Sequence, residues 1–262
     1  MCKRVIAGLG LGRREWIHRV PSVFGRQGAH YLGHLGPIPF YIHPSAIGLV
    51  LLVFFFNASS DVSAILVTLT VLVASIMLHE MGHALAARSL GAQGVSITLG
   101  GLGGLCESSR DARPSSELII LIAGPAVSFA LWFGCGSVLD WLLLHRPDLL
   151  INNLDITRGG RVTAGHSTLL YDFLSTGAGM NLVLGIFNSL PIFPLDGGQI
   201  VFNLMRLFPR SYTLARKATL LISFATGIGL VIFLATFSQL QNHTWTLFLV
   251  GLMLYNAWNY LR

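Results

Sequence analysis

Residues 61–87 decide the fold, and they read DVSAILVTLTVLVASIMLHEMGHALAA. The segment contains no proline, and Gly82 is its one glycine, so it predicts a single continuous helix. Such a helix is long enough to cross a hydrocarbon core of about 30 Å. Near its end it carries His79, Glu80 and His83. Ionisable side chains at membrane depth are costly and usually functional, so this helix is expected to span the membrane and to carry the chemistry.

The composition of the whole chain is that of a membrane protein. Of its 262 residues, 53% are hydrophobic and 11% are charged, whereas soluble domains carry about 25% charged residues. A weaker apolar stretch at residues 38–56 is interrupted by His43 and Pro44 but is still long enough to span. The sequence therefore predicts an all-α membrane protein, a polytopic bundle of about six transmembrane helices. The other five predicted spans are residues 62–78, 118–144, 169–190, 218–237 and 245–261.

The distribution of basic residues predicts the orientation. If the amino terminus is cytoplasmic, 17 basic residues divide so that all but Arg146, Arg158 and Arg161 lie on the cytoplasmic side. This division follows the positive-inside rule, and the opposite orientation violates it. The net charge of +6 is then a matter of topology and predicts no nucleic-acid partner. The chain is expected to be a multi-pass protein of the cell membrane.

Three segments are expected along the chain. Residues 1–37 form a basic cytoplasmic arm with little helical or strand periodicity, residues 38–210 form a transmembrane core, and residues 211–262 form a carboxy-terminal pair of transmembrane helices. Within the core, residues 94–104 begin with strand-like alternation and end in a glycine-rich turn, which predicts a short membrane-associated β element. Its strand at residues 95–99 either pairs with an extended substrate by β-augmentation or belongs to a structural hairpin that covers the metal.

The motif His79-Glu80-Met81-Gly82-His83 indicates a metal site. Residues four apart share one face of a helix, so the two imidazoles can converge on one ion, as in HExxH metalloproteases. Glu80 lies beside them and can act as a base without binding the metal.

A catalytic zinc site needs a third protein ligand. Asp140 and Asp172 are expected toward the outer ends of their spans, whereas Asp196 returns to the cytoplasmic side, level with the two histidines. The alternative for an Asp before Gly197 and Gly198 is an ordinary turn residue. The histidine pair at the same depth favours Asp196 as the third ligand.

Three motifs together resemble the site-2 protease family of intramembrane zinc metalloproteases. They are HEMGH at residues 79–83, Ala-Gly-Pro at residues 123–125, and NSLPIFPLDGG at residues 188–198. The resemblance covers roughly residues 36–210. It implies a bundle of transmembrane helices in a compact form, without an internal PDZ domain or a carboxy-terminal regulatory domain.

The same resemblance implies a role for each matching residue. His79, His83 and Asp196 would bind one Zn²⁺, and Glu80 would be the general base. Asn188, about two helical turns before Asp196, would donate a hydrogen bond to the substrate or to the developing oxyanion. The alternative for Asn188 is a hydrogen bond between helices.

One position departs from the family pattern. The family often has an Asn three residues after the proline of its Gly-Pro motif, and this chain has Ser128 there. The role of that family Asn is therefore in question for this chain.

The expected function is hydrolysis of peptide bonds in or near the transmembrane segments of membrane proteins, with single-span proteins as the expected substrates, within the bilayer. Substrate selection then depends on the membrane core or on a regulatory membrane partner. Two alternatives are transmembrane metal-ion transport and a catalytically silent zinc-binding relative. A transport pathway would distribute polar groups across the membrane, whereas these gather at one depth. A silent scaffold has no need of Glu80.

Overall fold

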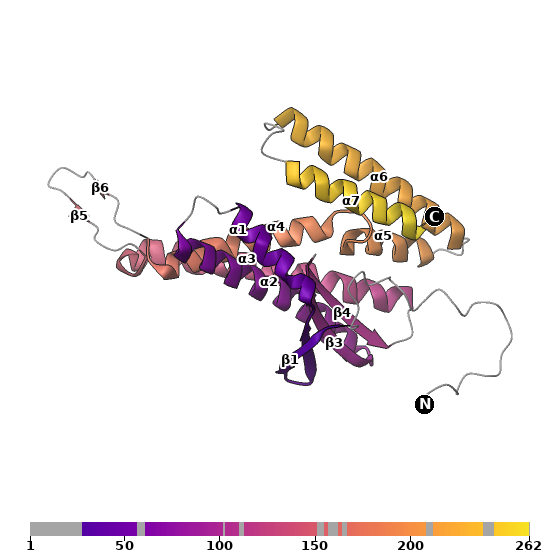
Figure 1. Cartoon of the computed structure of the whole chain (residues 1–262), viewed down its shortest axis with the longest axis horizontal. Helices are drawn as coiled ribbons and strands as arrows, with labels where there is room; N and C mark the ends of the chain where they lie inside the picture. Colours follow the sequence, from indigo (N-terminus) through magenta and orange to yellow (C-terminus); the bar gives the residue numbers. More distant parts are fainter. Residues whose placement is uncertain are drawn as a thin grey trace.

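The computed structural model is a bundle of long helices with a small β-sheet against one side (Figure 1). At its centre lie α2 (Val62–Ser89), α3 (Pro114–His145) and α4 (Leu169–Ser189), each packed against the other two. The structure describes residues 28–56, 61–101, 103–109, 113–150, 155–156, 162–163, 167–207, 212–237 and 244–261.

Four helices of the described residues are long and apolar enough to cross a membrane. They are α2, α3, α4 and the Tyr212–Phe233 part of α6 (Tyr212–Phe237). A further helix, α7 (Thr244–Leu261), occupies the last predicted span. The fold class of a helical membrane bundle with a short β element is thus confirmed, and α2 follows the helix predicted from residues 61–87.

The predicted first span, residues 38–56, does not form one continuous helix. Its apolar run begins as strand β2 (Ile38–Ile42), turns through a 3₁₀ helix at Pro44–Ala46, and ends as the short helix α1 (Ile47–Phe56). A helix of 10 residues rises about 15 Å, half of a hydrocarbon core. Apolar composition alone does not distinguish a buried strand from a helix, and here Pro44 divides the two.

The sheet has the strand order β1-β2-β3-β4, with β1 (His30–Leu35), β3 (Gln93–Gly100) and β4 (Gly103–Ser109). Strands β2 and β3 pair in parallel, and the other two pairs are antiparallel. The predicted hairpin at residues 94–104 is confirmed as β3 and β4. Strand β1 lies in the amino-terminal arm, where the sequence indicated little strand periodicity. The strand forms because β1 pairs with β2, so the local sequence pattern did not predict it.

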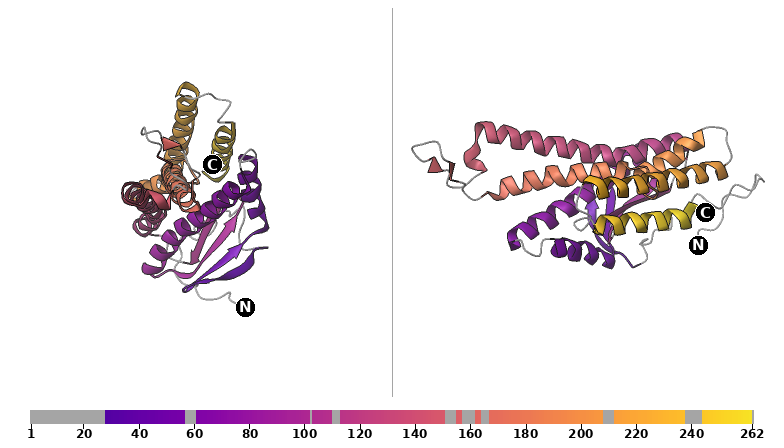
Figure 2. Two further views of the ribbon diagram at one scale, coloured as in Figure 1. Left: turned by 90° about the vertical axis from the view of Figure 1, so that its left-hand side faces the viewer. Right: turned by 90° about the horizontal axis from the view of Figure 1, so that it is seen from above.

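One face of the sheet packs on α2, on the side of α2 away from α3 and α4 (Figure 2, left). Alternate residues of the parallel pair point to this face because side chains of a strand alternate. This packing fixes the sheet next to the part of α2 that carries the histidines. The buried cluster includes Ile38, Phe40, Met81, Ala84, Ala87, Val95, Ile97 and Ile120.

The second half of the chain brings its own helices to the bundle. After α3, a 3₁₀ helix at Pro147–Leu149 leads to the short strand pair β5 (Asp155–Ile156) and β6 (Val162–Thr163). After α4, helix α5 (Asp196–Leu207) packs against α3, and α6 and α7 form a pair beyond it (Figures 1 and 2).

Candidate metal centre

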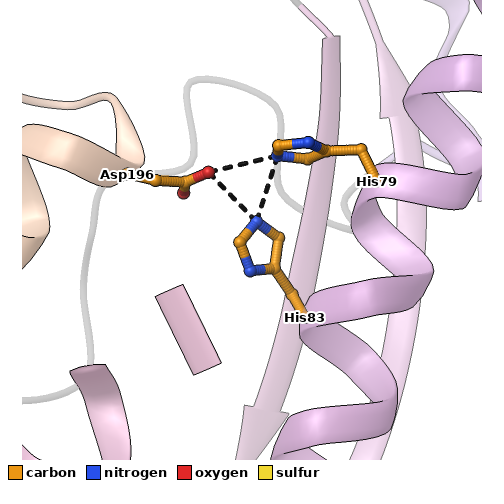
Figure 3. Close-up of side chains that lie close together, drawn as sticks. All are labelled: His79, His83 and Asp196. Atoms are coloured by element: carbon orange, nitrogen blue, oxygen red, sulfur yellow. Dashed lines mark hydrogen bonds and ion pairs between the residues drawn. The ribbon is translucent and has the colours of Figure 1, made fainter. Parts of the chain in front are cut away.

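Three buried side chains from two distant parts of the chain meet at one point (Figure 3). The Oδ2 atom of Asp196 lies 3.1 Å from Nε2 of His79 and 3.2 Å from Nε2 of His83. The two Nε2 atoms lie 3.2 Å from each other. The structure therefore brings together the three residues that the sequence predicted as metal ligands, and their ligand atoms all lie within 4.8 Å of one another.

The partners of the two Nδ1 atoms show that this triangle fits a cation. His83 Nδ1 lies 2.7 Å from the carbonyl oxygen of Ile120. A carbonyl only accepts, so Nδ1 carries the proton and donates it, and Nε2 of the neutral ring keeps a lone pair. His79 Nδ1 lies 2.9 Å from Ser128 Oγ, and a serine hydroxyl can accept a hydrogen bond from Nδ1 in the same tautomer. Two nitrogen lone pairs and a carboxylate oxygen then converge, which is the two-histidine, one-carboxylate donor set of catalytic zinc.

Helix α3 acts as the template for both imidazoles. Ile120, Gly124 and Ser128 are spaced by four residues and share one face of the helix. Ile120 and Ser128 hold the two Nδ1 atoms, and Gly124 lies between them. A Cβ on Gly124 would collide with His83 Nε2 and would come within 2.8 Å of His79 Nε2. The absence of a side chain at this position is what leaves room for the ligand atoms.

Asp196 reaches the site because the chain turns sharply between two helices. Helix α4 ends at Ser189, and Asp196 is the first residue of α5. A Cβ on Gly197 would collide with the carbonyl oxygens of Ser189 and Leu190, and one on Gly198 would collide with the main chain of Phe193. The two glycines therefore allow α5 to begin against the end of α4. The turn precedes Asp196, which begins α5 and lies with the two histidines in the group that could hold an ion.

Glu80 is beside the metal group and outside it. The group that could hold an ion comprises the two histidines and Asp196. Glu80 is half-buried, and its carboxylate accepts a hydrogen bond from the main-chain N–H of Cys106 in β4. A Cβ on Gly104 would collide with Glu80 Cγ, so β4 lies directly over this side chain. This arrangement suits a base that is held close to the metal without binding it.

Strand β3 is not available for β-augmentation by a substrate. It pairs with β2 on one side and with β4 on the other, so the predicted role of residues 95–99 as the receiving strand is wrong. A strand in the middle of a sheet has its main-chain groups occupied, and only an outer strand can accept another. The position of β4 over Glu80 fits the alternative, a hairpin that covers the site.

Asn188 lies near the end of α4 and does not join the metal group. Its Nδ2 atom donates to the carbonyl oxygen of Leu184, one turn earlier in the same helix, at 3.1 Å. The hydrogen bond between helices in this region is made by Asn181, which donates to Ser75 Oγ at 2.9 Å. Contact between Asn188 and a substrate stays a prediction.

Sequence reasoning assigned no role to three partners of the site. They are the carbonyl of Ile120, the hydroxyl of Ser128 and the main-chain N–H of Cys106. The spacing of Ile120, Gly124 and Ser128 on one face of a helix was a signal that could have revealed the first two. Main-chain partners in a neighbouring strand leave no comparable mark in the sequence.

Fold and site together define an integral membrane protein with a buried group of two histidines and one aspartate that could hold a metal ion. A sequence profile of Peptidase family M50 matches residues 67–144 and 150–250. The chain belongs to this family. The solved structure of the site-2 protease from Methanocaldococcus jannaschii has the same fold, with a TM-score of 0.60 and 24% sequence identity over 89% of this chain and 95% of that chain.

Relatives with sequence similarity are named as zinc metalloproteases. A candidate zinc metalloprotease of Synechocystis is 32% identical over 186 residues, which are 66% of this chain and 43% of that protein. The zinc metalloprotease MJ0392 of Methanocaldococcus jannaschii is 30% identical over 161 residues, 61% of this chain and 40% of that protein. The chain therefore matches less than half of the length of these relatives.

Replacing Ser128 with Ala should weaken zinc binding. Ser128 is fully buried, and its hydroxyl holds His79 Nδ1, so its loss frees the ring to change tautomer and orientation. Loss of such an outer partner typically costs about 10-fold to 100-fold in metal affinity. Chelator competition on the purified protein measures this. Ser175→Ala, whose hydroxyl bonds its own helix in α4, is the control. Equal affinity in both variants would contradict the role of Ser128.

Proposed function

We propose that this chain is an intramembrane zinc metalloprotease that hydrolyses peptide bonds in or near the transmembrane segments of membrane proteins. The observation that carries the proposal is the convergence of His79, His83 and Asp196 on one point inside the bundle, beside Glu80. Membership of Peptidase family M50 and the names of the relatives support it.

The residues of the site divide the chemistry between them. His79, His83 and Asp196 would hold one Zn²⁺, which when bound supplies Lewis-acid polarisation of the scissile carbonyl and activation of water. Glu80 in its ionised form accepts a proton from the attacking water at a carboxylate oxygen and later gives it to the leaving amine. The hydrogen bond from Cys106 N–H holds this carboxylate in place between the two transfers.

A specific observation weighs against each alternative function. For a metal-ion transporter, ligands are expected at several depths, yet within the described residues the potential ligands form a single group on α2 and α5. For a silent zinc-binding relative, a carboxylate held beside the metal has no use, yet Glu80 is present and hydrogen-bonded.

The proposed setting is the cell membrane, with the amino terminus and the metal site toward the cytoplasm. The unequal distribution of basic residues supports this orientation. The connection after α3 would then be external. A cysteine introduced at exposed Asp148 should react with a membrane-impermeant thiol reagent added outside intact cells. Reaction only after permeabilisation would indicate the opposite orientation.

The proposed partners are the lipid bilayer, a single-span membrane-protein substrate and a regulatory membrane protein. A library of single-span reporters with randomised transmembrane segments tests for such a substrate. The purified protein, reconstituted with zinc in liposomes, should cleave members of this library. Removing the metal with a chelator should stop cleavage, and zinc should restore it. Cleavage by metal-free protein would contradict the proposal, and zinc flux without cleavage of any member would favour transport.

Asn188 is proposed to contact the substrate. Its amide would exchange the bond to Leu184 for one to the substrate or to the developing oxyanion, a type of interaction worth about 3 kcal/mol in the transition state. In the reporter assay, Asn188→Leu should therefore slow cleavage by about 100-fold while zinc content is unchanged. Cleavage at the normal rate would remove Asn188 from the site.

A further inference from the structure

The metal ligands are held by two separate parts of the molecule. His79 and His83 belong to α2, and their outer partners Ile120 and Ser128 belong to α3. Asp196 begins α5 directly after the turn between α4 and α5, and this turn has its own support. Helix α5 packs against α3 and against α6, and α6 pairs with α7, so part of that support comes from the carboxy-terminal helices (Figure 1).

One hydroxyl of α6 holds the main chain of the turn. The N–H of Phe193 donates to Ser223 Oγ at 3.0 Å, and both residues are buried. The Ser223 hydroxyl in turn donates to the carbonyl oxygen of Thr219 at 2.8 Å, within α6. The Ser223 hydroxyl thus connects the turn to α6: its oxygen accepts from Phe193, and its hydrogen is donated within α6. Loss of this hydroxyl would leave a buried N–H without that acceptor, which is unfavourable inside a protein.

The side chain of Phe193 is held by the same helix pair. It is 4% exposed and forms a buried cluster with Ala257 of α7, against which Leu220 of α6 packs. Main chain and side chain of one residue are therefore both fixed by the carboxy-terminal helices.

The turn between Phe193 and Asp196 is stiff enough to transmit this support. The N–H of Leu195 donates to the carbonyl oxygen of Ile192 at 2.9 Å, which closes a tight turn around Phe193. Gly198 packs so closely against the main chain of Phe193 that an added Cβ would collide with it. A displacement of Phe193 must therefore move the first turn of α5, and Asp196 is its first residue.

We propose that Ser223 is a positioning residue for Asp196, through which the helix pair α6 and α7 holds the carboxylate ligand against the two histidines. The zinc affinity of the site then depends on where this pair sits relative to α2 and α3. The inference rests on the proposed function only in taking Asp196 as a zinc ligand, and its test measures metal binding without cleavage.

The test compares Ser223→Ala with Thr219→Ala in the full-length protein in detergent. Thr219 is the matched control, because it is equally buried in α6, one turn away, and its hydroxyl bonds the carbonyl of Ala215 in its own helix. Chelator competition should show zinc affinity reduced about 10-fold to 100-fold in Ser223→Ala, as for other outer partners of a ligand. Thr219→Ala should stay close to the unaltered protein.

Two further measurements separate positioning from general damage. Ser223→Thr keeps a hydroxyl at this position and should restore most of the affinity. The absorption spectrum of the cobalt-substituted protein should change in Ser223→Ala and not in Thr219→Ala, because only the former moves a ligand. Equal zinc affinity and equal spectra in the two alanine variants would overturn the proposal. Failure of the proposed protease function would appear separately, as cleavage by metal-free protein.

Discussion

Replacing Glu80 with Gln should nearly abolish cleavage while zinc stays bound. Glutamine keeps the size of the side chain, and its amide oxygen can still accept the hydrogen bond from Cys106 N–H, so the geometry is retained. It cannot take a proton from water at neutral pH. Positioned general acid–base catalysis typically contributes about 10²-fold to 10⁴-fold, and cleavage of the reporter library should slow by that factor. Zinc content is unaffected because the metal group does not include Glu80.

The control for this variant is Glu107→Gln in β4. Glu107 neighbours Cys106 in the strand, so its side chain points to the opposite face of the sheet, away from α2. The same chemical change there should leave both cleavage and zinc content close to normal. Cleavage that survives Glu80→Gln would show that this carboxylate is not the base. Loss of zinc in Glu80→Gln would instead indicate that Glu80 supports the metal.

Replacing Gly124 with Ala should eliminate tight zinc binding in a protein that still folds. The added methyl group would occupy the space of His83 Nε2 and press on His79 Nε2, which are the two atoms that face the metal. Imidazole rings can rotate away where a main chain cannot, so the ligands move and α3 is retained. The loss of zinc affinity should be at least about 100-fold, the upper end of the losses seen for outer partners.

Gly134→Ala provides the matched control for this second variant. It adds the same methyl group to the same helix, at a position where nothing lies within 4 Å of the new atom. Helix content by circular dichroism should be similar for the two variants, and zinc affinity by chelator competition should differ. If Gly124→Ala binds zinc as tightly as Gly134→Ala, the close packing of α3 against the imidazoles is not what shapes the site.

Glu80→Gln and Gly124→Ala test two different requirements of the same site, a chemical group and the space around it. Glu80→Gln removes a chemical group and leaves the packing, whereas Gly124→Ala leaves every chemical group and removes the space they need. Ser128→Ala and Ser223→Ala lie between these extremes, because each removes one hydrogen bond to a residue that carries or holds a ligand. Together the four variants separate the base, the ligands and their two supports.

The fold could be predicted from sequence where the pattern of a single segment is enough to define a helix. Helix α2 follows from an uninterrupted apolar run, and its observed limits match the prediction closely. The apolar run at residues 38–56 was misread, because strand β2 is apolar for a different reason, its burial between β1 and β3. Whether an apolar segment becomes a strand depends on partners that lie far away in the sequence, and β3 begins some fifty residues after β2.

The sequence by itself determined where the proposed metal-binding pair and the proposed base lie on one helix. His79 and His83 share a helix face at their spacing wherever that helix lies, and Glu80 is necessarily beside them. Only the tertiary structure decided how these groups are held: the partners on α3 that orient both imidazoles, the space left at Gly124, and the turn that α6 holds so that Asp196 completes the triangle. The physical reason is the separation along the chain of the residues that interact. Helical spacing is a local property of the chain, whereas hydrogen bonds and close contacts between helices exist only once the bundle has packed.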